Sequence, residues 1–415
     1  MKQATLRRLI SIGMLLVLVV LFTILSGMSF LNSTNLINIL RDASVVAIVG
    51  VGVTYVIITS GIDLSTGAIM AVVGMVMANV YAYTLWPIPV MLLIGVAVGL
   101  VCGLVNGFIV GKLHVPEFIA TLATMSIYRS FTYIIAVRDA NGVIQSQPMV
   151  VRDFTVFGGA MWLGGVIGPF YIVTSAALVF IIVGQIVLKL THFGTNLYSV
   201  GASKKAATLS GISISKTQII AYVVVGLCAA VGSIFTIARL QSATTSIGLG
   251  FEFDPIAAAV IGGVSLAGGS GDVIGMAIGA IFMAALDNGV LKLGVNTAVQ
   301  YIIKGAVIIA VVIFDAVYKK VMDKRAKARG AEAVPAVETV AASETGALGV
   351  AIATAVAVGA YDTVEDAVAA MVSVSGRFEP RYDLRRIYDG KYDLYCKTVD
   401  ALDGVWDDMQ KLVDA

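Results

Sequence analysis

The 415-residue chain has little charge: Asp, Glu, Lys and Arg make up only 13% of it, about half the share in an average soluble domain. Apolar residues make up 58%, and the mean hydropathy is +0.93. Five long stretches hold no acidic or basic side chain: residues 9–40, 43–62, 64–111, 154–188 and 217–238. Because about 20 apolar residues let a helix cross the hydrocarbon core, each stretch has room for a span. The composition excludes an ordinary soluble domain and predicts an all-α, polytopic transmembrane bundle.

Cysteine and histidine are also scarce. Cys102, Cys228 and Cys396 lie far apart, which excludes a disulfide framework and a zinc site. His114 and His192 have no other metal ligand at a suitable spacing, and a G-x-x-x-x-G-K-[ST] phosphate loop is absent. We therefore expect no metal, no cofactor, no catalytic group and no nucleic-acid partner. If ATP drives this protein, the ATPase is another chain.

We predict about ten spans from the apolar runs. The first run is longer than the apolar region of a signal peptide and no small-residue cleavage site follows it, so we interpret it as an uncleaved span. The eighth is too short to cross a bilayer. The predicted spans are 9–31, 43–60, 67–85, 88–110, 118–137, 170–190, 218–239, 256–266, 273–291 and 299–318.

Basic residues indicate the orientation of the bundle. Cytoplasmic loops carry an excess of Lys and Arg. An even number of spans places all the basic clusters on one side, so both termini are predicted to be cytoplasmic. These clusters are Lys2, Arg7 and Arg8; Lys112; Lys189, Lys204, Lys205 and Lys216; and Lys319, Lys320, Lys324, Arg325, Lys327 and Arg329.

A few polar side chains interrupt the spans. Arg129 lies near the middle of the fifth span, where a charge costs about 3 kcal/mol or more on insertion scales. Two interpretations stay open: Arg129 lies on a polar translocation path, or it has a structural role, in which it extends to an interface or pairs with a carboxylate such as Asp287. Lys304 and Asp287 raise the same question. Our candidates for the path are Asn106, Arg129 and Asn288.

Two glycine-containing segments predict tight turns next to spans. In residues 61–67 (GIDLSTG), Asp63 and Ser65 can cap the helix that follows Gly61. Residues 251–273 (FEFDPIAAAVIGGVSLAGGSGDV) place Glu252 and Asp254 before a short apolar run. The glycines that let the backbone double back after that run are Gly262, Gly263, Gly268, Gly269 and Gly271.

The loop after the sixth span contains a small-residue cluster. Ala206, Ala207 and Gly211 would leave one face of a short helix open to close approach by a partner, and Gly211 would end that helix in a left-handed conformation. An ordinary loop helix with lysines at the lipid surface explains the same residues. Their chemistry alone leaves both interpretations open.

Five segments in order resemble the permease subunit of bacterial ABC importers for monosaccharides, the ribose/xylose/galactose class. They are residues 61–67, 115–129, 198–212, 251–273 and 300–315. The resemblance implies an inner-membrane permease that pairs with a second copy or a sister permease. It also implies cytoplasmic ATPase subunits as partners and a periplasmic sugar-binding protein, which Glu252 and Asp254 would contact. The implied ATPase-docking loop comprises Gly201, Lys204, Lys205, Ala206, Ala207 and Gly211, with Lys205 where the family often has an acid.

The resemblance leaves two alternatives open. One is the same architecture carrying another solute, such as a branched-chain amino acid or a signal sugar. The other is a bifunctional transporter–kinase, because residues 337–413 resemble the C-terminal end of FGGY carbohydrate kinases. That segment lacks the catalytic region, so we expect no kinase activity. We predict a permease domain over 1–329, a linker over 330–344 and a kinase-like cytoplasmic helical tail over 345–415, with an amphipathic helix over 384–402.

Overall fold

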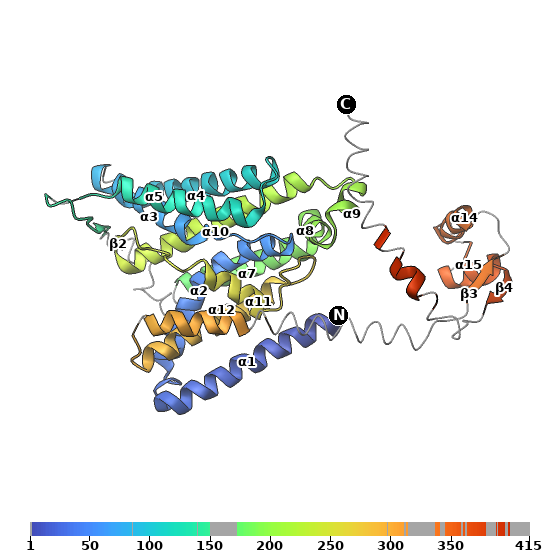
Figure 1. Ribbon diagram of the computed structural model, residues 1–415, viewed down its shortest axis with the longest axis horizontal. Helices are drawn as coiled ribbons and strands as arrows, with labels where there is room; N and C mark the ends of the chain where they lie inside the picture. The colour runs from blue at the N-terminus through green and yellow to red at the C-terminus, as the bar shows by residue number, and fades with distance from the viewer. Residues whose placement is uncertain are drawn as a thin grey trace. The chain divides into compact units, whose positions relative to one another are not determined.

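A computed structural model gives the fold of the chain. It divides into two compact units, Met1–Val317 and Tyr318–Ala415, which we describe separately (Figure 1). The described residues are 2–84, 86–138, 140–149, 172–296, 298–310, 313, 337–340, 345–357, 360–361, 363–378, 387, 389–394 and 397–398.

Eight helices of the described residues are long and apolar enough to cross a membrane. They are α1 (Lys2–Ser26), α2 (Ser33–Ile58), α3 (Thr66–Thr84), α4 (Ile88–Gly111), α5 (Glu117–Ile135), α7 (Ile172–Leu190), α10 (Ile214–Leu240) and α12 (Val273–Lys292). The other two predicted spans correspond to α11 (Phe253–Ile261) and to the helix Ala298–Ala310. The prediction of an all-α polytopic bundle is confirmed.

The second span begins earlier than the charge pattern predicted. Helix α2 starts at Ser33, after the one-turn helix η1 (Gly27–Ser29), and so includes Arg41 and Asp42. The Asn32 side chain accepts a hydrogen bond from the Thr34 N–H and caps the helix. Asp42 forms an ion pair with Arg239 near the end of α10. This pairing allows two charged residues to lie within the helix.

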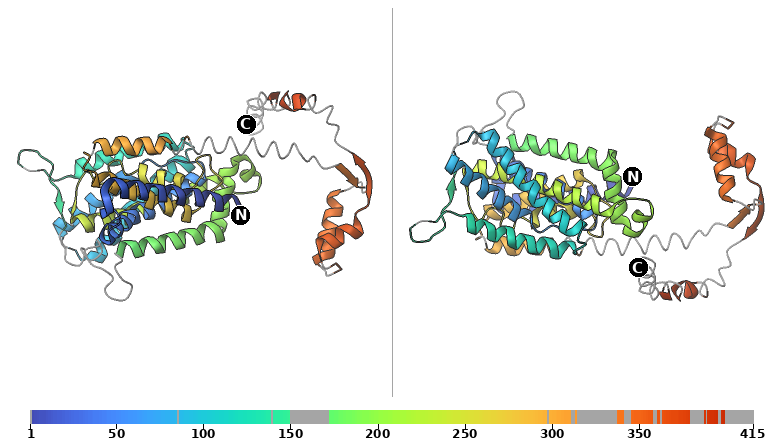
Figure 2. Two further views of the ribbon diagram at one scale, coloured as in Figure 1. Left: turned by 90° about the horizontal axis from the view of Figure 1, so that it is seen from below. Right: turned by 90° about the horizontal axis from the view of Figure 1, so that it is seen from above.

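Helix α2 lies at the centre of the bundle. Residues along its second half are almost all buried, and α7, α10, α11 and α12 pack around it. The most extensive helix pair is α4 with α10, which run alongside each other (Figures 1 and 2). Gly99 and Gly103 of α4 face Gly226 of α10, backbone against backbone. Small residues at such contacts let membrane helices approach closely.

The two ends of the first unit differ in structure. At one end lie the short helices α8 (His192–Ala202) and α9 (Lys204–Leu209), and we call this the α9 end. At the other, the β2 end, strand β1 (Gln147–Pro148) pairs antiparallel with β2 (Ser242–Ala243), in the register Gln147 to Ala243 (Figure 1). This pairing ties the segment after α5 to the segment after α10.

The second unit contains strands as well as helices. Strand β3 (Val337–Val340) pairs antiparallel with β4 (Val374–Phe378), and helices α14 (Thr345–Ala357) and α15 (Val364–Met371) lie between them in the chain. The tail therefore contains a two-stranded sheet beside its helices, and strand β3 lies within the residues that we predicted as a linker. Most of the predicted helix over 384–402 lies outside the described residues.

The α4–α10 contact generates a stability prediction. A Cβ at Gly103 would lie 2.5 Å from the carbonyl oxygen of Tyr222, so we expect Gly103→Ala to lower the free energy of unfolding by about 1–3 kcal/mol. Gly13→Ala on α1 is the control, because a Cβ there meets no atom within 4 Å. Thermal unfolding in detergent measures both. Equal midpoints for the two variants would contradict the tight packing.

Candidate functional site

Helix α9 is a short helix closed at both ends by its own loop. The Ser203 side chain accepts a hydrogen bond from the Ala206 N–H, 3.2 Å away. At the other end Gly211 has a φ of +76°, and the Ile212 N–H donates to the Ala207 carbonyl at 2.9 Å. This is the Schellman pattern of a left-handed helix cap. The loop therefore forms a fixed projection at the α9 end.

The two alanines of α9 lie on different faces. Ala207 is buried, whereas Ala206 is exposed and Leu209 is 88% exposed. The Lys204 Nζ lies 3.1 Å from Glu117 Oε1, at the start of α5. Lys205 is exposed. The exposed surface of α9 is therefore apolar at Ala206 and Leu209, with a lysine beside it.

Gly201 plays a different part from the rest of the predicted docking loop. A Cβ at Gly201 would overlap the carbonyl oxygen of Ile58, and it would lie 2.6 Å from the Gly269 nitrogen. The end of α8 therefore packs directly against backbone from two other loops. Gly201 holds the α9 projection against the bundle and has little surface to offer a partner.

The predicted glycine turn after α11 meets the end of α2 beside α8. The Gly269 N–H donates to the Ile58 carbonyl at 2.9 Å, and the Ser60 hydroxyl donates to the Ala267 carbonyl at 2.9 Å. The Tyr198 hydroxyl of α8 donates to the Gly271 carbonyl at 2.7 Å. Positive φ angles, which favour glycine, occur at Gly263, Gly268, Gly269 and Gly271. By contrast, Gly262 has an ordinary φ and permits close approach to Gly275, while a Cβ at Gly61 would crowd Val56.

A buried hydrogen-bonded chain orders the start of α3. Asp63 Oδ1 accepts from the Ser65 N–H at 2.7 Å and from the Ser65 hydroxyl at 2.6 Å. The Asn106 amide donates to Ser65 Oγ at 2.7 Å, and the Tyr128 hydroxyl donates to Asn106 Oδ1 at 3.1 Å. Burial raises the pKa of Asp63 to about 6, against the lowering effect of the Ser65 bonds. Asn106 is fully buried in this chain, so it does not line an open path in this conformation.

Arg129 holds a loop that enters the bundle. Its guanidinium donates to the Thr245 carbonyl at 2.8 Å and to the Ile247 carbonyl at 2.7 Å. It also interacts electrostatically with Glu252. The partner we named from the sequence, Asp287, contacts Lys304 instead. The loop 241–252 reaches deep enough for Gly248 to pack on the backbone of Gly67, at the start of α3.

Lys304 joins two carboxylates inside the bundle. Its Nζ lies 2.8 Å from Asp254 Oδ1 and 3.0 Å from Asp287 Oδ2. Glu252 and Asp254 are only 8% and 6% exposed, which argues against the predicted contact with an external partner. The physical reason is that α11, nine residues and about 14 Å long, starts within the bundle rather than at its surface. Its acids are therefore matched by cations from α5 and from the helix Ala298–Ala310.

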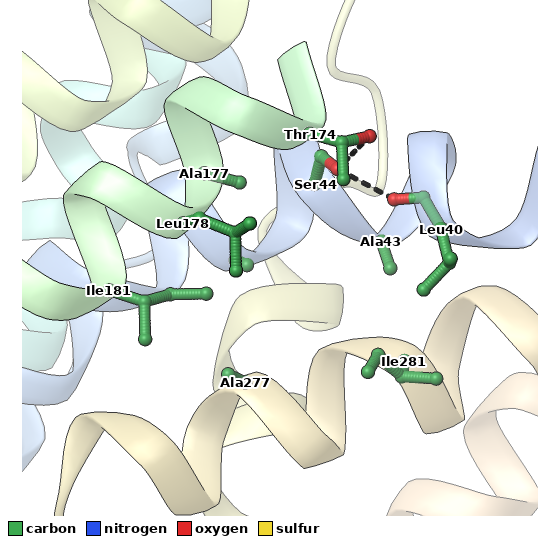
Figure 3. A pocket seen from close by; sticks show the side chains of 10 residues that line it. Leu40, Ala43, Ser44, Thr174, Ala177, Leu178, Ile181, Ala277 and Ile281 are labelled. Carbon is green, nitrogen blue, oxygen red and sulfur yellow. Dashed lines mark hydrogen bonds between the residues drawn. The ribbon is translucent and has the colours of Figure 1, made fainter. Parts of the chain in front are cut away.

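Two cavities near these helices differ in polarity. One, of about 210 Å³, is lined by Asp42, Asp287, Asn288, Leu291, Gln300, Tyr301 and Lys304. The other, of about 80 Å³, lies between α2, α7 and α12 and is mostly aliphatic (Figure 3). Its two hydroxyls, on Ser44 and Thr174, are 3.1 Å apart and bond to each other. Of the path candidates, Asn288 alone lines a described polar cavity.

The Lys304 cluster generates a prediction. Lys304→Met leaves Asp254 buried without its cation, and we expect a loss of about 3–5 kcal/mol in stability. Lys304→Met combined with Asp254→Asn should recover most of it, since the stranded charge is removed. Arg239→Met is the control: its pair with Asp42 is exposed, and about 1 kcal/mol or less is expected. Folded yield and thermal midpoints in detergent measure the stability of the three variants. A double variant that is no more stable than Lys304→Met would contradict the prediction.

Comparison with known proteins places this architecture. The family model described as branched-chain amino acid transport system / permease component matches residues 35–312. The ribose import permease protein RbsC of Escherichia coli strain K12 is 39% identical over 308 residues, covering 72% of this chain and 92% of the relative.

Two further relatives are similar over comparable lengths. The galactose/methyl galactoside import permease protein MglC of Haemophilus influenzae is 36% identical, covering 69% of this chain and 88% of the relative. The xylose transport system permease protein XylH of the same organism is 31% identical, covering 78% and 99%. No solved structure matches the chain. The chain belongs to the branched-chain amino acid transport system permease component family.

Proposed function

We propose that this chain is the membrane-spanning subunit of an ATP-binding-cassette importer that carries a monosaccharide across the bacterial inner membrane. The observation that carries the proposal is the similarity, over most of both chains, to permeases named for ribose, galactose and xylose. The chain is a transport component rather than an enzyme. ATP hydrolysis belongs to separate cytoplasmic subunits, and sugar arrives from a periplasmic binding protein.

The orientation that fits this role places the α9 end in the cytoplasm. Lysines gather at this end, on the loops and short helices that join the long ones: Lys112, Lys189, Lys204, Lys205 and Lys216. An excess of basic residues is typical of cytoplasmic loops. In this orientation the N-terminus is cytoplasmic, and the β2 end faces the binding protein.

Helix α9 is our candidate for the ATPase contact. Ala206 and Leu209 offer an exposed apolar surface on a capped helix, and apolar anchors of this kind fit a partner's groove. Lys204, Lys205 and Gly211 flank it. Movement of the ATPase would be transmitted through Gly201, whose backbone contacts the loops after α2 and α11.

A second permease copy, identical or a sister chain, completes the proposed importer. The wide exposure of long apolar side chains on α1 and α7 is compatible with lipid on these helices.

The second unit lies beyond the family match, which ends at residue 312. We interpret it as a kinase-like fragment without phosphoryl-transfer activity, derived from a neighbouring gene of a sugar-utilisation cluster. An intact kinase gene at the same locus would support that history.

The docking proposal predicts the effect of a charge on α9. Leu209→Glu places a carboxylate in the apolar contact, so we expect binding of the ATPase to weaken about tenfold or more. Co-purification with the ATPase encoded beside this gene measures it. Leu113→Glu is the matched control, because Leu113 is 57% exposed but lies in the loop between α4 and α5. Equal loss in both variants, or none in Leu209→Glu, would argue against α9.

The transport proposal predicts sugar uptake that depends on this gene. Cells lacking it should fail to accumulate the labelled pentose or hexose that the parent strain takes up, and loss of the ATPase should have the same effect. Labelled branched-chain amino acids are the comparison. If their uptake falls while sugar uptake persists, the alternative solute is correct. Sugar uptake that survives loss of the ATPase would exclude the ATP-binding-cassette mechanism.

A further inference from the structure

The polar cavity lies between three segments that are distant in sequence. Asp42 comes from the first part of α2, Asp287 and Asn288 from α12, and Tyr301 and Lys304 from the helix Ala298–Ala310. Polar atoms contribute much of its lining, in contrast to the aliphatic cavity in Figure 3. A lipid chain in this space would lie against an amide and a charged amine, which is costly. Water or a polar solute fits the cavity better.

Asn288 lines this cavity, and its buried acceptor Oδ1 has no hydrogen-bond partner in the described part of the chain. A buried acceptor without a partner costs about 1–3 kcal/mol, so a rotation of the Asn288 side chain toward a donor in the cavity is favoured. Gln300 also lines the cavity, and its amide nitrogen donates to the Val295 carbonyl at 3.1 Å. Its carbonyl oxygen adds a second acceptor.

An aromatic ring forms another wall. Tyr301 is 52% exposed and lines the cavity. On one side its ring meets Gly250, where a Cβ would lie 3.2 Å from a ring carbon. Gly250 has a φ of +75° and belongs to the loop that Arg129 holds. The ring is therefore supported from behind by the backbone, and it offers an apolar surface beside the amides.

The charges of the cavity select against an anion. Lys304 is the only cation among its lining residues, and it already contacts Asp254 and Asp287. At the rim, Asp42 pairs with Arg239. An amino acid would need a cation for its carboxylate, and a sugar phosphate would need more than one. Neutral hydroxyl groups instead find acceptors in Asn288, Gln300 and the partly exposed Asp287.

We propose that this cavity is a low-affinity binding subsite for a neutral monosaccharide, with its hydroxyl groups donating to Asn288 and Asp287 and its C–H face lying on Tyr301. Sites on a conduction path bind well enough to admit the solute and weakly enough to release it. The subsite rests on the proposed transport function, and it adds a place and a recognition chemistry. It also predicts that the permease itself discriminates against branched-chain amino acids.

The test is direct binding to the full-length protein in lipid nanodiscs, measured by saturation-transfer difference NMR with D-ribose, D-xylose, D-galactose and L-leucine as probes. We expect a saturable signal for at least one sugar and none for leucine. Asn288→Leu removes the acceptor at similar volume and should weaken the sugar about fivefold. Tyr301→Ala should weaken it, and Tyr301→Phe, which keeps the ring, should not.

Ser44→Ala is the matched control, because it removes a hydroxyl from the aliphatic cavity and should leave sugar binding unchanged. Size-exclusion profiles identify any variant that fails to fold. Binding unaffected by both Asn288→Leu and Tyr301→Ala would overturn the subsite. The subsite would also be overturned if the protein bound no sugar but still supported uptake. That result is expected if a second copy of the chain fills the cavity. Loss of uptake specificity for sugars in cells would instead overturn the transport function.

Discussion

The structure depends on one constraint: a charge inside an apolar bundle must meet an opposite charge or hydrogen-bonding groups of the right kind. Lys304 meets it with two carboxylates, one from α11 and one from α12. Arg129 meets it with two carbonyl oxygens of the loop 241–252, beside Glu252. In both cases the cation brings together segments far apart in the chain. At the start of the half-length helix α11, Asp254 forms an ion pair with Lys304, and Glu252 interacts electrostatically with Arg129.

Backbone contact supplies what side chains do not. Glycines at Gly67 and Gly248 let the entering loop touch the start of α3, and Gly262 and Gly275 bring the turn after α11 against α12. Without side chains between them, these segments have few alternative arrangements. Irregular backbone at this depth is tolerated only where protein or water covers it. Beside α3, the hydrogen bonds that link Asp63, Ser65, Asn106 and Tyr128 cover the irregular backbone with protein.

Composition and charge spacing were enough to predict the class and the places of the eight spanning helices, although not the count of about ten, because the energetic cost of charge in a bilayer is large and local. The end of α9 at Gly211 was also readable, since a cap depends on neighbouring residues. The partners of Arg129, Glu252 and Asp254 were not, because each lies tens of residues away and any acid or carbonyl would serve. Strand β3 was not predicted for the same reason, because its pairing partner β4 begins 34 residues after β3 ends.

The contacts connect the α9 end to the polar cavity without a break. Lys204 bonds Glu117 at the start of α5, and Arg129 on the same helix holds the loop 241–252. That loop supports Tyr301 at Gly250 and leads into Asp254, the buried partner of Lys304. These contacts form a continuous series from α9 through α5 to two residues of the cavity wall, Tyr301 and Lys304. Lys304 contacts both carboxylates at once, at 2.8 and 3.0 Å, and so ties α11 to α12 at the point where this series of contacts reaches the cavity.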